Sequence, residues 1–191
     1  MLDFDQSTIW QALEERLART ERPRHRQLLS VVIEHGKAEA ARSLDRLMAT
    51  LVADPQYHFW IDGRDVGPKG YDGVRRYYEA FVMSGGAVFE SPKERIVVDD
   101  DTISHEGTLR NLVSGAIAAA RGYRVPDTRG HYLVRFRNVV FWSFDEGGLA
   151  LGEDVYSSTH PDAFEAVADA DLPQVYRDYL AELDEVQASR R

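Results

Sequence analysis

A histidine that interrupts an apolar strand face is the first feature of this sequence that could do chemistry. Residues 102–112 predict a strand, and successive strand residues point to opposite sides, so Ile103, His105 and Leu109 share one face. Imidazole titrates near neutral pH and a carboxylate partner can tune its pKa, which makes His105 a candidate acid/base group. A core histidine bonded to backbone groups, or a histidine in a dimer interface, would give the same pattern.

A carboxyl group occupies a similar position in the last predicted strand. Alternation places Leu149, Leu151, Glu153 and Val155 on one face, and a carboxylate there is costly to bury without a function or a partner. Burial would raise the pKa of Glu153 and suit it to proton transfer near pH 7. A salt bridge to an arginine on a neighbouring element is the alternative. A bulge in this strand would exchange the two faces.

Five further residues could contact a ligand held near this pair. They are His58, Trp60, Tyr78, Asn138 and Ser157. A histidine beside a tryptophan would form a wall for a flat apolar ligand and offer it one proton donor. The tyrosine hydroxyl and the asparagine amide could hydrogen-bond to a ligand oxygen. For the aromatic residues and the amide, ordinary core packing with the polar atoms bonded to backbone groups is the alternative reading.

Other reactive arrangements are not indicated by the sequence. No pair of histidine or acidic residues has the local spacing of metal ligands, so we expect no metal site. The glycines at 63, 67 and 70 lack the following lysine of a phosphate loop, and no G-x-S-x-G nucleophile motif occurs. His25 and His35 are predicted to lie at helix ends, where solvated or capping roles suffice.

Hydrophobic spacing predicts the elements that must position these residues. Helices are expected from Ser7, from Pro23 to a glycine cap at His35-Gly36, and over residues 40–51. A short strand over 56–61 and a helix over 70–84 follow, after which the hydrophobic period changes from 3.6 to 2. The expected strands are Arg95–Val98, Thr102–Leu112, Gly130–Phe144 and Leu149–Ser157. Helices first and an antiparallel sheet afterwards indicate an α+β fold, with a helical tail over 159–191.

Composition narrows the class of protein. The 191 residues suit a single globular domain, and 43% of them are hydrophobic. The formal net charge of −9 disfavours binding to nucleic acid. Cysteine is absent, which excludes disulfides, thiolate catalysis and cysteine-ligated metals. No apolar run reaches the ~20 residues that a membrane helix needs, and the first thirty residues lack the apolar core of a secretory signal, so we expect a cytoplasmic protein.

Three stretches of the sequence carry a family resemblance. They are Gly70–Val74 at the start of a predicted helix, Arg121–Pro126 leading into a long strand, and Gly147–Leu149 followed by Gly152–Tyr156. The first is similar to the opening of the third helix, and the last to the SnoaL-like chain ending, in the nuclear-transport-factor-like (NTF2-like) superfamily. That superfamily includes ketosteroid isomerase, scytalone dehydratase, limonene epoxide hydrolase and the SnoaL-like polyketide cyclases. The resemblance implies a cone-shaped, curved antiparallel sheet wrapped around N-terminal helices and enclosing an apolar cavity. It covers a core of about residues 25–158.

The resemblance also implies a range of functions. The first is an enzyme of the isomerase, dehydratase, cyclase or hydrolase type that performs cofactor-free acid/base chemistry on a small apolar, oxygenated ligand such as a polyketide or a steroid. His105 and Glu153 would then be the catalytic pair. The alternative is a ligand-binding or protein-interaction module of the same fold, which Ser157 favours because relatives often carry an aspartate there. A subunit of a larger oxygenase is a third possibility. A homodimer is expected because relatives commonly pair through the outer sheet face.

Overall fold

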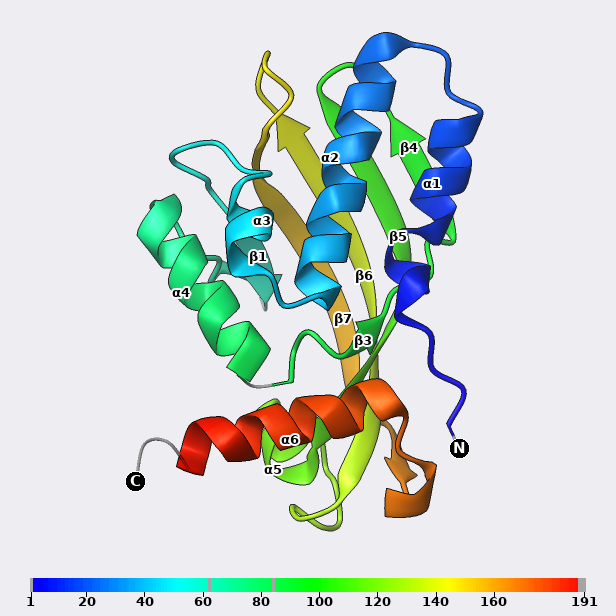
Figure 1. Ribbon diagram of the computed structural model, residues 1–191, viewed down its shortest axis with the longest axis vertical. Helices are drawn as coiled ribbons and strands as arrows, with labels where there is room; N and C mark the ends of the chain where they lie inside the picture. The colour runs from blue at the N-terminus through cyan, green and yellow to red at the C-terminus, as the bar shows by residue number, and fades with distance from the viewer. Residues whose placement is uncertain (1, 62, 84, 189–191) are drawn as a thin grey trace.

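The computed structural model describes residues 2–61, 63–83 and 85–188 (Figure 1). Its helices are η1 (Gln6–Ile9), α1 (Gln11–Ala18), α2 (Pro23–Ala40), α3 (Leu44–Met48), α4 (Gly70–Met83), α5 (Gly115–Ala120), η2 (Asp169–Asp171) and α6 (Gln174–Ala188). Its strands are β1 (His58–Ile61), β2 (Arg64–Asp65), β3 (Phe89–Glu90), β4 (Arg95–Val98), β5 (Thr102–Ser114), β6 (His131–Phe144) and β7 (Ala150–Val167). No helix within these ranges is long and apolar enough to cross a membrane.

One curved sheet supports the whole molecule. Its strands run in the order β2-β1-β7-β6-β5-β3, and β4 pairs with another stretch of β5. The pairing is antiparallel except between β1 and β7, which are parallel. Figure 1 shows α2 lying along one face of the sheet, with α3 between it and α4, and α6 crossing below. The predicted α+β fold, with a curved sheet around N-terminal helices, is confirmed.

Helix α2 does not end at His35-Gly36, as the glycine had suggested. It continues to Ala40, and the chain reverses only at Arg42, whose φ is 53°. Gly36 is needed for packing instead, because a Cβ at this position would lie 2.8 Å from Cγ2 of Ile9 in η1. The extra turn matters because residues four apart share a helix face, so His35 and Glu39 now point the same way.

A bulge in β7 corrects the predicted faces of that strand. The pairing of β6 with β7 shifts between Ser143 and Phe144, which pair with Gly152 and Ala150. Leu151 therefore faces outward at 41% exposure, and Leu149 is exposed in the preceding turn, while Ala150 is buried. Beyond the bulge the predicted parity holds, and Glu153 still faces the concave side of the sheet.

The tail is helical only in its second part. Residues 159–167 extend β7 rather than forming a helix, since the first residues of β6 offer them backbone partners, with His131 opposite Val167 and Val134 opposite Phe164. The helix that begins beyond Pro173 is confirmed as α6. It packs on a separate apolar cluster that includes Val88, Leu112, Leu133, Tyr176 and Tyr179. None of its described residues lines the cavity, so α6 supports the end of the sheet.

Candidate functional site

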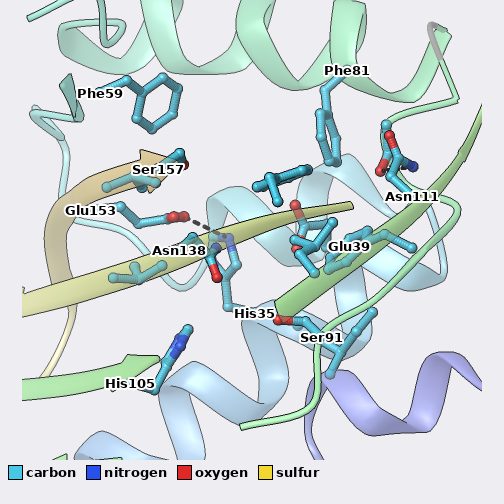
Figure 2. Close-up of a pocket in the computed structure, with 18 of the residues that line it drawn as sticks. His35, Glu39, Phe59, Phe81, Ser91, His105, Asn111, Asn138, Glu153 and Ser157 are labelled. Atoms are coloured by element: carbon cyan, nitrogen blue, oxygen red, sulfur yellow. Dashed lines mark hydrogen bonds and ion pairs between the residues drawn. The ribbon is translucent and has the colours of Figure 1, made fainter. Parts of the chain in front are cut away.

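A cavity of about 620 Å³ lies between the concave face of the sheet and the helices α2 and α4. Most of its wall is apolar. Polar side chains enter it from five parts of the chain. The side chains that carry the chemistry are His35, Glu39, Ser91, Lys93, His105, Asn138 and Glu153. Figure 2 shows Glu153, Asn138 and His105 on neighbouring strands, facing the same space as His35 and Glu39 from α2.

Glu153 belongs to a buried hydrogen-bonded cluster. The hydroxyl of Tyr78 lies 3.0 Å from Glu153 Oε1 and 2.9 Å from Nε2 of His35. The hydroxyl of Tyr57 is 3.1 Å from that of Tyr78. Nε2 of His35 is itself 3.6 Å from Glu153 Oε1 (Figure 2). The carboxyl group is thus held by side chains from three other elements or loops, which fixes its direction in the cavity.

The protonation state of His35 follows from its contact with Thr50. The hydroxyl of Thr50 donates to the carbonyl of Leu47 at 2.6 Å, so it can only accept from Nδ1 of His35 at 2.7 Å. Burial lowers the pKa of His35 to about 3, and the ring is therefore neutral with its single proton on Nδ1. Nε2 is left as an acceptor that faces Tyr78.

The pKa of Glu153 reflects this arrangement. Burial raises it to about 7, and hydrogen bonds from Tyr78 and Tyr57 hold it from rising further. The one hydroxyl proton of Tyr78 can serve His35 or an ionised Glu153, but not both. A carboxyl group that titrates near neutral pH can take up and release a proton under physiological conditions.

His105 has a different role from the one its position suggested. Its Nε2 accepts a hydrogen bond from the indole N–H of Trp142 at 3.3 Å, which places the ring proton on Nδ1. Nδ1 has no partner within the described residues, although the side chain is only 6% exposed. Burial, followed by the charge of Lys93, holds the pKa of His105 well below its usual value. The ring is a neutral donor.

The two residues of the predicted catalytic pair are not bonded to each other. Both line the cavity, but no hydrogen bond or ion pair joins Glu153 to His105 in the described ranges. Glu153 has His35 and Tyr78 as its partners, and His105 has Trp142. The structure therefore separates a group that can move protons from a group that can only donate a hydrogen bond.

Glu39 and Lys93 add two more ionisable groups. Burial and the charge of Glu153 raise the pKa of Glu39 to about 8, while Lys93 acts in the opposite direction. Burial lowers the pKa of Lys93 to about 8, against the attraction of Glu39 and Glu153. The ammonium group donates to Ser91 Oγ at 2.6 Å. No ion pair with either carboxyl group forms within the described residues.

Asn138 and Ser157 lie where the sequence placed them. They are paired across β6 and β7, and both line the cavity. Asn138 is 7% exposed, and its side-chain amide makes no hydrogen bond to any described residue. The amide is consequently free to bond to a ligand oxygen, which was one of the two readings of this residue.

His58, Trp60 and Tyr78 are distributed differently from the expected wall. His58 lies outside the cavity, where its Nδ1 is 2.7 Å from Asp65 Oδ2 and 2.9 Å from the ammonium of Lys69. Trp60 is 38% exposed at the rim and stacks on Tyr156. Tyr78 is buried and contacts the cavity-lining residues Glu153 and His35. Phe59, on the other face of β1, lines the cavity together with Tyr77 and Phe81 of α4.

Three cavity residues were not proposed as site residues from the sequence, and the solvated or capping role expected for His35 is wrong, because its side chain is buried and bonded to Thr50 and Tyr78. His35 and Glu39 were missed because the helix was ended one turn too early, although their spacing of four residues continues the apolar stripe of Leu28 and Val32. Lys93 lies between two short strands in a segment with no periodic pattern. Tertiary contacts position that segment: a Cβ on Gly107 would lie 2.0 Å from the carbonyl oxygen of Pro92, and the backbone N–H of Glu94 donates to the carbonyl of Glu106 at 2.9 Å.

No family model matches the sequence, and no curated protein matches it. The structure is nevertheless similar to a proposed SnoaL-like polyketide cyclase of Jannaschia sp. CCS1, with a TM-score of 0.54 and 14% identity over 73% of this chain and 91% of that one. It is also similar to SalBIII, an epoxide hydrolase/cyclase-like enzyme of pyran ring formation in the polyether salinomycin. The TM-score is 0.51, with 10% identity over 74% of this chain and 96% of that one.

A third similar structure has no known activity. It is an NTF2-like protein of unknown function from Burkholderia pseudomallei, with a TM-score of 0.52 and 18% identity over 69% of this chain and 91% of that one. At such identities the likeness concerns the fold, because the same fold carries many functions. The chain therefore has the cone-shaped NTF2-like fold that SnoaL-like proteins share.

Proposed function

We propose that the cavity binds a small apolar ligand with an oxygen function and catalyses proton transfer on it, with Glu153 as the catalytic acid/base. One observation carries the proposal: Glu153 lines an apolar cavity, is fixed by Tyr78 and His35, and has its pKa raised to about 7. A base is most effective when its pKa lies near the working pH. The Nδ1–H of His105 is then the donor for a ligand oxygen on which negative charge develops.

The order of events follows from these assignments. Ionised Glu153 removes a proton from carbon next to a carbonyl, or from a water or hydroxyl group, and becomes neutral. Neutral His105 cannot take up that proton at ordinary pH, but its N–H stabilises the oxygen that gains charge. The amide of Asn138 is a second donor for the same ligand. Isomerisation, dehydration, cyclisation and hydration all fit this scheme, and the solved relatives named for cyclase or epoxide hydrolase-like activity support that range.

The test is proton exchange on a neutral ketone. The protein is incubated in deuterated buffer with 5-androstene-3,17-dione, and exchange and double-bond migration are followed by NMR and by ultraviolet absorbance. We expect Glu153→Gln to lower the exchange rate by about 10²–10⁴-fold with little change in ligand affinity, since amide and acid have the same shape. We expect His105→Phe, which keeps an apolar ring, to cost about 10²-fold.

The matched control is Glu94→Gln, a change of the same type on the surface. Exchange that is equally fast in the wild type, Glu94→Gln and Glu153→Gln would remove Glu153 from the mechanism.

A binding protein without turnover is the second candidate function. Ser157 favours it, since it stands where relatives often have an aspartate. Trp142 lines the cavity and reports on its occupation by fluorescence. Saturable quenching by steroid-like and polyketide-like compounds, with every compound recovered unchanged, would favour binding over catalysis.

A further inference from the structure

Lysine is scarce in this protein, and one of its lysines lies in the cavity. The chain has 20 arginines but only three lysines, at positions 37, 69 and 93. Lys37 is paired with Glu14, and Lys69 with Asp65, both at the surface. Lys93 lines the cavity instead. Arginine keeps its proton at any physiological pH, whereas a buried lysine can lose one and become a nucleophile.

The backbone directs Lys93 inward. The segment that carries it lies directly over Gly107 of β5, where even a methyl group would collide with the carbonyl of Pro92. The ammonium group donates one hydrogen bond, to Ser91 Oγ at 2.6 Å. It has no ion-pair partner among the described residues, so two of its three N–H donors are left for the cavity.

The neighbours of Lys93 can remove and return its proton. Glu39 and Glu153 are the two acidic groups that act on it, and both line the same cavity. Lys93 and Glu39 both have a pKa near 8, one lowered and the other raised by burial. A part of the amine is therefore unprotonated near neutral pH, and a part of Glu39 is ionised and able to accept a proton.

The wall of the cavity suits an apolar carbonyl compound. Two carboxyl groups, Glu39 and Glu153, and two cations, Lys93 and Arg121, lie in an otherwise largely apolar wall, so their formal charges balance. A ketone or aldehyde brings no charge, and its oxygen can accept from the Nδ1–H of His105 or the amide of Asn138.

We propose that Lys93 is a nucleophile that forms an imine with a neutral, apolar ketone or aldehyde bound in the cavity. Ionised Glu39 takes a proton from the ammonium group, and the amine attacks the carbonyl carbon. One proton then passes from the nitrogen to the oxygen, which gives a neutral carbinolamine. Glu39 returns its proton to the hydroxyl group, the C–O bond breaks, and water leaves as the nitrogen lone pair forms the C=N bond of a protonated imine. The step needs no oxidant or cofactor. The inference rests on the proposed function only in placing a carbonyl compound in this cavity.

Reductive trapping tests the proposal without any turnover. The protein is mixed with 2-naphthaldehyde and sodium cyanoborohydride near pH 7.5, and the modified residue is located by peptide mass spectrometry. We expect one reduced adduct on Lys93, formed at least tenfold faster than on Lys37 or Lys69. Labelling of Lys93 should rise steeply between pH 6 and 9, because its pKa is about 8.

Variants separate this proposal from its alternatives. Lys37→Arg with Lys69→Arg leaves Lys93 as the single lysine and should label like the wild type, whereas Lys93→Arg should lose the adduct. Glu39→Gln should slow trapping by about tenfold or more, because the proton shuttle is lost. Glu153→Gln should still be trapped at Lys93 even if proton exchange on ketones stops. Labelling that follows surface exposure, with Lys37 and Lys69 modified first, would overturn the proposal.

Discussion

At the scale of single residues, neighbours decide what each polar group can do. Trp142 fixes the proton of His105 on Nδ1, and Thr50 fixes that of His35 on the same atom of its ring. One histidine thus becomes a donor toward the cavity and the other an acceptor toward Tyr78 and Glu153. The sequence shows two histidines, and only their partners distinguish them.

The raised pKa of Glu39 predicts how its loss changes stability with pH. A carboxyl group with a pKa of about 8 in the folded protein and 4.5 unfolded favours folding below pH 4.5, and this contribution is lost as pH rises through 8. Glu39→Gln should therefore match the wild type near pH 4.5 and be more stable by about 4 kcal/mol at pH 8.5, because the pKa rises from 4.5 to about 8 and each pKa unit is worth about 1.4 kcal/mol.

Urea unfolding at the two pH values measures this difference. Glu185→Gln, on the exposed surface of α6, is the matched control and should show no such gain. A Glu39→Gln variant less stable than the wild type at pH 8.5 would contradict the buried, proton-binding state of this residue.

At the scale of elements, one extra helical turn and one bulge build the site. The last turn of α2 brings Glu39 beneath His35, since residues four apart share a helix face. The bulge at Gly152 keeps Glu153 on the concave side while the leucine before it turns outward. Both features depend on glycines in tight contact, Gly36 with Ile9 and Gly152 with Gln56.

Gly152→Ala should be strongly destabilising. Gly152 has a φ of 154°, and an added Cβ would lie 1.9 Å from the carbonyl oxygen of Gln56, a backbone atom that cannot move alone. We expect a loss of about 3 kcal/mol in the free energy of unfolding. Gly122→Ala is the control, because its φ of 88° is also strained but nothing lies within 4 Å, and about 1 kcal/mol is expected. Equal losses in thermal or urea unfolding would refute the crowding argument.

At the scale of the molecule, the convex face of the sheet carries an exposed aromatic row. Trp60 stacks on Tyr156, which contacts Phe141 edge to face, so one aromatic row crosses β1, β7 and β6. All three side chains are more than a third exposed. Exposed apolar patches of this kind mark interaction sites, and a second copy of the chain is the occupant that the resemblance implied.

The homodimer remains a prediction, and a single charged substitution in the aromatic row tests it. Phe141→Glu should convert a dimer to a monomer in light scattering after size-exclusion chromatography, because a carboxylate would be buried in the apolar interface. Tyr71→Glu, on α4 at the opposite face of the sheet, should leave the dimer intact. A wild-type protein that is monomeric at micromolar concentration would show that this row serves another purpose.

What the sequence determined by itself was the periodic part of the protein. The change from helical to strand spacing predicted the α+β fold, and alternation placed His105, Asn138 and Glu153 on the concave face, because hydrophobic patterning follows local geometry. Tertiary structure alone decided which groups meet. Gly36 ends no helix because Ile9 packs on it, β7 lengthens because β6 offers backbone partners, and Lys93 enters the cavity because its loop lies on Gly107. These are contacts between residues far apart in the chain, and the protonation states of the site residues depend on them.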